Sequence, residues 1–171
     1  MDKKAEKFNS GDRFMPGILA RLTDNNPEQK TENYTRGISV RLLRKDILWN
    51  IETLLNSRSH PPEKDWNGDS EVMNSVLGYG LCDFCGQTHK KRNLVRLKDE
   101  ILRQIRLFEP RLDPDSLVAK IVNDEDVNTV PVSLEIEVRG VISVVALKDE
   151  LVFCSKLDLE TGNATVAVMD T

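Results

Sequence analysis

Two stretches of the chain repeat apolar residues every three or four positions, which is the spacing of one face of an α-helix. The first stretch lies between residues 40 and 55, and the second between residues 94 and 108. Their apolar stripes are formed by Val40, Leu43, Ile47, Ile51 and Leu54, and by Leu94, Leu97, Ile101, Ile105 and Phe108. The pattern predicts two long amphipathic helices.

Polar residues and a proline mark the expected ends of these helices. Ser39 and Asn93 can accept hydrogen bonds from free N–H groups of a first helical turn, so each is predicted to cap one helix. The first helix is expected to end in Asn56-Ser57-Arg58. The second is expected to end at Glu109, because Pro110 has no N–H and its ring disfavours helical geometry at the preceding residue.

A shorter helix and a loop are expected around the first long helix. Residues 25–37 contain almost nothing that could be buried and are interpreted as a loop. The short helix is predicted over Val72 to Leu77. Either Gly78 or Gly80 would end it, since glycine is the usual residue after a helix C-terminus.

Beyond Pro114 the period of the apolar residues changes from 3.6 to 2, which is typical of β-strands. The expected strands cover residues 117–122, 132–138, 151–159 and 164–169. Gly140 is interpreted as a bulge or bend, and Asp149-Glu150 as a turn. Four consecutive strands with short turns form an antiparallel β-meander. Packed against the two long amphipathic helices, this meander gives an α+β fold class.

The last predicted strand has the composition of a strand that pairs with another chain. Ala164 to Met169 is short, β-prone and uncharged. It lacks the Lys or Pro that usually protects an exposed sheet edge. As an edge strand it would bind a partner through residues such as Val166 and Val168. The alternative is a central strand that is already paired on both sides.

The composition is that of an ordinary soluble protein. The chain has 171 residues, three cysteines and a formal net charge of −4, which gives no reason to expect nucleic acid or an anionic membrane as a partner. An odd number of cysteines does not form a disulfide framework. Because the N-terminus resembles no secretory signal and no segment has the length of a membrane span, a cytoplasmic location is expected. Residues 1–13 are predicted to be a flexible N-terminal segment, and residues 14–171 a single domain.

Cys82, Cys85 and His89 form the arrangement that most resembles a metal or redox site. A structural zinc site needs four ligands, and the remaining candidates, His60 and Cys154, are distant in the sequence. A redox C-x-x-C motif would open a helix after a strand, whereas this pair lies in an expected loop. We therefore predict no metal and no cofactor.

Glu109 lies at the negative end of the second helix, where a carboxylate is disfavoured by roughly 0.3–1 kcal/mol. A nearby cation would relieve this, and Arg111 is the candidate. A glycosidase would need a second carboxylate across a cleft, but Asp113 and Asp115 lie in an extended segment flanked by prolines. The sequence has neither a Ser-His-Asp spacing nor a Gly-rich phosphate loop. It predicts no catalytic residue and no enzyme.

Several short segments follow one another in an order that resembles a known family. They are Leu54-Leu55-Asn56-Ser57-Arg58, Ser75-Val76-Leu77-Gly78-Tyr79-Gly80-Leu81, Glu109-Pro110-Arg111-Leu112 and Leu157-Asp158-Leu159-Glu160-Thr161-Gly162. From about Phe14 to the C-terminus the chain resembles the TssE family. This family is a baseplate subunit of the type VI secretion system, related to the small wedge protein of contractile phage tails. In the family pattern Cys82 stands at a proline position and Cys85 at a small residue before Gly86, which implies a loop variant rather than a metal site.

The resemblance implies a structural subunit of the baseplate wedge. The implied partners are the baseplate subunits TssF, TssG and TssK, the VgrG spike, and the sheath subunits TssB and TssC. The subunit would link the wedge to the first sheath ring and help to initiate sheath assembly, in the cytoplasm near the inner membrane. Two alternatives stay open: a peptidoglycan-cleaving, lysozyme-like enzyme, and a generic adaptor that binds through its sheet edge.

The resemblance also assigns a role to one turn. Glu109, Pro110 and Arg111 match the family signature, which faces the wedge partners, and an arginine can bind a carboxylate bidentately. Both charged residues follow the last apolar contact at Phe108, so we expect their removal to weaken assembly and to leave the fold nearly intact. The alternative is that the two charges pair with each other and secure the turn.

Overall fold

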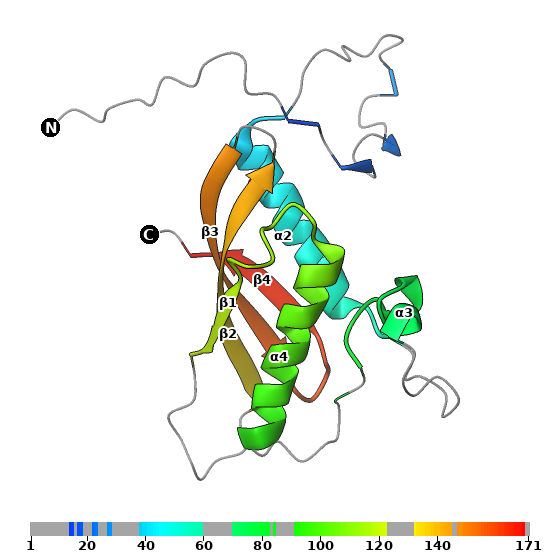
Figure 1. Cartoon of the computed structure of the whole chain (residues 1–171), viewed down its shortest axis with the longest axis vertical. Helices are drawn as coiled ribbons and strands as arrows, with labels where there is room; N and C mark the ends of the chain where they lie inside the picture. The colour runs from blue at the N-terminus through cyan, green and yellow to red at the C-terminus, as the bar shows by residue number, and fades with distance from the viewer. Residues whose placement is uncertain are drawn as a thin grey trace, which may run out of the picture. The chain divides into compact units, whose positions relative to one another are not determined.

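The computed structural model describes residues 14–15, 17–18, 22–23, 27–28, 38–59, 70–82, 84, 91–122, 132–144 and 147–169. Its longer elements are the helices α2 (Val40–Asn56) and α4 (Lys91–Phe108) and the strands β1 (Val118–Ile121), β2 (Ser133–Val144), β3 (Leu147–Asp158) and β4 (Ala164–Val168) (Figure 1). A short helix, α3 (Ser70–Met73), and a 3₁₀ turn, η2 (Val76–Gly78), lie between the long helices in the sequence. The segment 1–13, expected to be flexible, lies outside the described residues.

The chain divides into two compact units, Met1–Ile47 and Leu48–Thr171. In the first unit Phe14 and Ile38 form an antiparallel bridge, in which the Ile38 N–H donates to the Phe14 carbonyl over 2.8 Å. The second unit contains the sheet, α4 and the second half of α2. The single domain expected over residues 14–171 stays a prediction.

The helix ends follow largely from local chemistry. The Ser39 hydroxyl accepts the N–H of Leu42 over 3.4 Å, which confirms the predicted cap of α2. α2 ends at Asn56, the first residue of the segment in which its end was predicted, and α4 ends at Phe108, directly before Glu109-Pro110. The predicted cap at Asn93 is wrong, because α4 already begins at Lys91 and Asn93 lies inside its first turn.

The predicted short helix is two separate pieces, α3 and η2. Ser75 divides them, because its hydroxyl donates to the carbonyl of Val72 over 2.7 Å and accepts the N–H of Leu77 over 3.3 Å. A serine that bonds to the backbone on both sides ends one helix and caps the next. Gly78, one of the two glycines expected to end the helix, is the last residue of η2, and Tyr79 follows it as the C-cap.

The four strands form one antiparallel sheet in the order β1-β2-β3-β4 (Figure 1). This confirms the predicted meander and the α+β class. Alternate residues of the long strands point to the side of the sheet that faces the helices, and the buried members of this set include Leu134, Ile136, Val138, Leu151, Phe153 and Leu157. The opposite face carries charged residues, for which the ion pair between Lys156 and Glu135 at 2.9 Å is an example.

Two details of the predicted strands are wrong. Asp149 and Glu150 are not a turn, since they lie inside β3 and pair with Ile142 and Val141 of β2. Pairing along a long partner strand outweighs the weak strand preference of two consecutive acidic residues. The bulge that was one of the two structures expected at Gly140 is also ruled out, because the β2–β3 register is unbroken from end to end.

Gly140 has a packing role instead. A Cβ atom at this position would lie 2.8 Å from Cδ2 of Leu117, which is too close for two carbon atoms. Leu117 is buried. The glycine therefore allows the segment before β1 to lie directly against β2.

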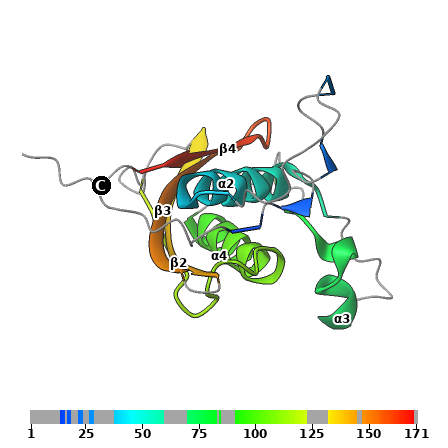
Figure 2. The same cartoon turned by 90° about the horizontal axis from the view of Figure 1, so that it is seen from above.

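The core of the second unit lies between the sheet and the helices. Figure 2 shows α4 and the second half of α2 over the same face of the sheet. The helical contribution to this core consists of Leu48, Ile51, Leu54, Leu55, Ile101, Leu102 and Ile105, all buried. Each fully buried aliphatic side chain of this size stabilises the fold by about 1.5–3 kcal/mol. The predicted helical stripes supply most of these residues.

Candidate partner-binding surface

The Glu109-Pro110-Arg111 turn follows α4 in the chain and lies against the end of β2. The Glu109 N–H still bonds to the carbonyl of Ile105 over 3.0 Å, and the carbonyl of Glu109 accepts the N–H of Leu112 over 3.1 Å. The Arg111 carbonyl then accepts the N–H of Ser143 over 2.8 Å. These backbone bonds fix the direction in which the chain leaves α4. The next residue, Leu112, is buried.

The side chains of Glu109 and Arg111 pair with each other. Nε of Arg111 donates to Oε1 of Glu109 over 2.6 Å, and Nη2 donates to Oε2 over 2.8 Å. The Glu109 side chain is only 2% exposed and the Arg111 side chain 21%. The sequence correctly indicates Arg111 as the neighbouring cation. Its expectation that both residues lie on the surface is wrong for Glu109, because the bidentate guanidinium makes burial of the carboxylate tolerable.

Tyr79 brings a second segment next to this turn. Its ring contacts that of Phe108 edge to face, with centroids 5.1 Å apart. Burial, and then the negative charge of Glu109, raise the pKa of the Tyr79 hydroxyl. Two segments that resemble the TssE pattern, residues 75–81 and 109–112, therefore meet at the end of α4.

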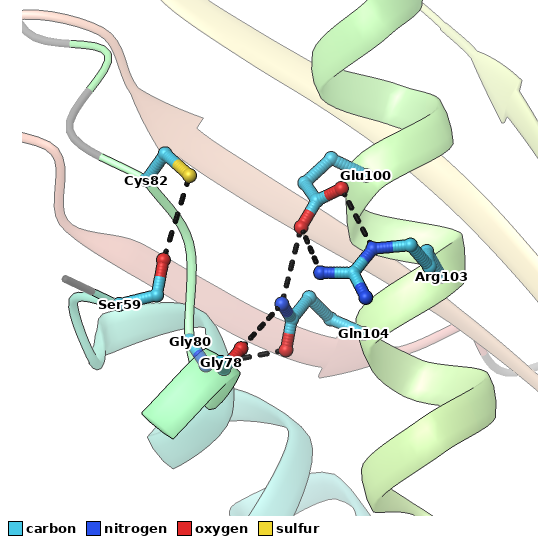
Figure 3. A network of polar contacts seen from close by, with 7 residues as sticks. All are labelled: Ser59, Gly78, Gly80, Cys82, Glu100, Arg103 and Gln104. Atoms are coloured by element: carbon cyan, nitrogen blue, oxygen red, sulfur yellow. Dashed lines mark hydrogen bonds and ion pairs between the residues drawn. The ribbon is translucent and has the colours of Figure 1, made fainter. Parts of the chain in front are cut away.

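Gln104 fixes the loop that carries Tyr79. It is fully buried in α4, its Nε2 donates to the carbonyl of Gly78 over 2.8 Å, and its Oε1 accepts the N–H of Gly80 over 3.2 Å (Figure 3). Gly80 has a φ of +100°, and a Cβ there would lie 2.5 Å from the carbonyl oxygen of Ser57. A side chain at this position would push the loop away from α2. Sequence reasoning missed Gln104, although its place one turn after Ile101 on the apolar stripe was a signal.

Glu100 and Arg103 extend this polar network toward solvent. Arg103 donates from Nε and Nη2 to the two carboxylate oxygens of Glu100, over 2.9 and 2.7 Å. Gln104 also donates to Glu100, over 3.1 Å (Figure 3). Burial alone would raise the pKa of Glu100, but the hydrogen bonds from Arg103 and Gln104 and the charge of Arg103 outweigh it and hold this pKa below its ordinary value.

This network predicts a specific loss of stability in acid. A carboxylate whose pKa is lower in the folded state contributes stability above its unfolded pKa, and this contribution is lost as the pH falls through the folded value. We expect Glu100→Gln to remove part of the decrease in unfolding free energy between neutral pH and about pH 3. The effect is a fraction of the total, because the Glu100 side chain is 30% exposed and therefore partly screened by solvent. Urea unfolding of both proteins across this range measures it, and identical pH dependence in the two would contradict the assignment.

Asn56 and Arg58 connect the end of α2 to the hairpin between β3 and β4. Asn56 Nδ2 donates to the carbonyl of Ala164 and Oδ1 accepts the N–H of Ala164, both over 2.9 Å. Arg58 Nη2 donates to the carbonyl of Gly162 over 2.6 Å. The turn itself is closed by Asp158, whose Oδ1 accepts the N–H of Thr161 over 2.8 Å. These contacts explain why residues 54–58 and 157–162 both carry a recognisable pattern.

β4 is the last strand of the sheet and pairs with β3 alone within the described ranges. This confirms the edge-strand expectation over the central-strand alternative. Two bonds of the β3–β4 ladder are made by the Asp158 N–H to the Asn163 carbonyl and by the Met169 N–H to the Val152 carbonyl. Hydrogen-bonded positions alternate in an antiparallel ladder, so the backbone N–H and C=O of Val166 and Val168 point away from β3. No described residue pairs with these outward groups.

The remaining sequence candidates give no site. Cys82 has an exposed free thiol, and its sulfur accepts a hydrogen bond from the Ser59 hydroxyl over 3.5 Å. Cys85, His89 and His60 lie outside the described residues. Over the described ranges, no three His, Cys, Asp or Glu side chains are grouped so that they could hold a metal ion. None of the described helices has the length and apolar character needed to cross a bilayer.

The class of protein follows from a comparison with known families. A family model described as baseplate wedge protein gp25 matches residues 41–145, which is more than half of the chain. The chain belongs to this family of baseplate wedge proteins. The match confirms the resemblance seen in the sequence and includes the Glu109–Arg111 turn. Neither a curated protein nor a solved structure gives a match.

Proposed function

We propose that this chain is the TssE-like subunit of a type VI secretion baseplate wedge. The observation that carries the proposal is the family match over residues 41–145, since baseplate wedge proteins are structural and associate with other baseplate components. In this proposal the chain works in the cytoplasm, close to the inner membrane. It contacts TssF, TssG and TssK around the VgrG spike, and it helps to start the sheath of TssB and TssC.

The Glu109-Pro110-Arg111 turn is the proposed contact with the wedge partners. Glu109 is too deeply buried to touch a partner, so its role is to position the guanidinium of Arg111. Pro110 is exposed, and the side chain of Arg111 keeps a fifth of its surface accessible. Backbone bonds on both sides of the turn hold this pair in one orientation, which lowers the entropic cost of binding.

The open edge of β4 is the proposed contact with the sheath. Val166 and Val168 direct outward backbone donors and acceptors that no described residue pairs with, and β4 contains neither Lys nor Pro. Such an edge binds an extended strand of another chain through main-chain hydrogen bonds, with little demand on its sequence. A subunit that begins a repeating polymer needs this kind of contact.

We also propose that the protein has no catalytic activity. Both oxygens of the Glu109 carboxylate are bound by Arg111, and the side chain is 2% exposed. A lysozyme-like reaction would require this carboxyl group to reach a glycosidic oxygen, with a second carboxylate across a cleft. Neither requirement fits a carboxylate that is buried against its own arginine.

A pull-down of the tagged full chain, with mass spectrometry of its partners, tests the proposal. We expect baseplate and sheath subunits of the same secretion system to be captured. A generic adaptor would instead capture a regulatory protein and none of these subunits. Dose-dependent hydrolysis of peptidoglycan by the pure protein, abolished in Glu109→Gln, would favour the enzymatic alternative.

A further inference from the structure

At the first residue of β4, Ala164, a side chain already binds the backbone groups that face the open edge. The carboxamide of Asn56 both donates to and accepts from the backbone of Ala164, over 2.9 Å in each direction. This is the pair of bonds that a residue of a neighbouring β-strand would make. We infer that Asn56 caps the edge and thereby sets the register in which a partner strand joins β4. The register role rests on the proposed pairing of β4 with the sheath.

The alternation of the ladder makes this cap specific. Ala164, Val166 and Val168 have the same orientation in the strand, so each directs its N–H and C=O toward the open edge. Asn56 occupies these two groups at Ala164 and leaves those at Val166 and Val168 open. An incoming strand can therefore pair at two successive outward positions of β4 but not at the first.

Asparagine is well suited to this task. Its carboxamide has the donor and acceptor of a peptide group, whereas aspartate has acceptors only. The second N–H of Asn56 Nδ2 donates to the carbonyl of Glu52 over 2.9 Å, which fixes the side chain along α2. Arg58 holds the adjacent turn at Gly162. The two bonds to Ala164 and the bond from Arg58 to Gly162 together join the end of α2 to the hairpin.

The consequence of the cap concerns side-chain direction. A slip of one residue in a strand pair moves every side chain to the other face of the sheet, and a slip of two residues shifts the whole strand along the edge. With Ala164 closed, an incoming strand cannot move toward the β3–β4 turn. The ligand that fits is an extended segment of another protein, which supplies backbone groups opposite Val166 and Val168.

Amide hydrogen exchange of the full chain, followed by NMR, tests the cap. In the natural sequence we expect the Ala164 amide to be protected and the Val166 amide to exchange rapidly. Asn56→Ala should speed exchange at Ala164 by roughly tenfold, the effect of one lost hydrogen bond. Asn56→Asp is the matched control, because its carboxylate still accepts the Ala164 N–H and should keep that amide protected. Equal exchange at Ala164 in the natural sequence and in Asn56→Ala would overturn the cap.

The register is tested by the addition of TssB–TssC sheath subunits from the same secretion system. In the natural sequence we expect new protection at Val166 and Val168. In Asn56→Ala we expect protection by the sheath to extend to Ala164, and sheaths of irregular length or order by electron microscopy. Protection confined to Val166 and Val168 in both proteins would overturn the register role. If the sheath protects neither residue in the natural sequence, the proposed sheath contact fails, and the register role with it, while the exchange of Ala164 in the free protein still decides the cap.

Discussion

Replacement of Arg111 by alanine is expected to lower the free energy of unfolding by about 3–5 kcal/mol, because it leaves the buried carboxylate of Glu109 without its partner. The guanidinium occupies both oxygens of this carboxylate, and the side chain of Glu109 has almost no contact with water. A charge in such a site needs compensation, and the negative end of α4 adds to its cost. Urea unfolding at neutral pH measures the loss.

The chain contains a matched control for this change. Arg139 pairs with Glu137 over 2.7 Å at the same sequence spacing, but its side chain is 60% exposed. Arg139→Ala should leave the unfolding midpoint nearly unchanged, because water replaces an exposed partner. The double variant Glu109→Ala/Arg111→Ala should lose less stability than the sum of the single variants, since removal of both charges leaves neither buried alone. If Arg111→Ala and Arg139→Ala lowered the free energy of unfolding equally, the Glu109–Arg111 pair would behave as an exposed ion pair, and the large effect expected from burial would be contradicted.

Replacement of Val166 by proline is expected to abolish sheath polymerisation while the protein still folds and enters the wedge. Proline removes the N–H of Val166, which points to the open edge rather than to β3. Edge strands tolerate proline where the N–H faces outward, so the loss of stability should be small. Sheath formation is measured by electron microscopy or sedimentation, and wedge assembly by co-purification with baseplate subunits.

Ala167→Pro provides the comparison, because the Ala167 N–H belongs to the β3–β4 ladder. This variant should lose clearly more stability than Val166→Pro. Normal sheaths with Val166→Pro would exclude β4 as the template. A Val166→Pro protein that unfolds as readily as Ala167→Pro would show that the orientation assigned to the strand is incorrect.

Most of the fold was predictable because it depends on local patterns. The helical stripes and the period-2 alternation place apolar residues on one side of each element, and Pro110 ends α4 by its covalent structure alone. The errors arose where pairing or packing with a distant segment decides. Asp149-Glu150 lies in a strand because β2 continues beside it, and Gly140 is a glycine because Leu117 lies against it.

The site was predictable only in part, for the same reason. The sequence indicates Arg111 as the partner of Glu109, since two residues are enough to define that turn. It does not reveal that the carboxylate is buried, because burial depends on how distant segments of the chain pack around the turn. Nor does it reveal the contact between Asn56 and Ala164, which are 108 residues apart.

The connections of Asn56 and Arg58 have a mechanical consequence for a baseplate subunit. A strand held only by its neighbour can be peeled away one hydrogen bond at a time. The start of β4 and the turn before it are also fastened to α2, and α2 is joined through Ser57 and Leu81 to the loop that Gln104 anchors on α4. A pull on the end of β4 is therefore shared among the sheet and both helices, so that these bonds resist it together.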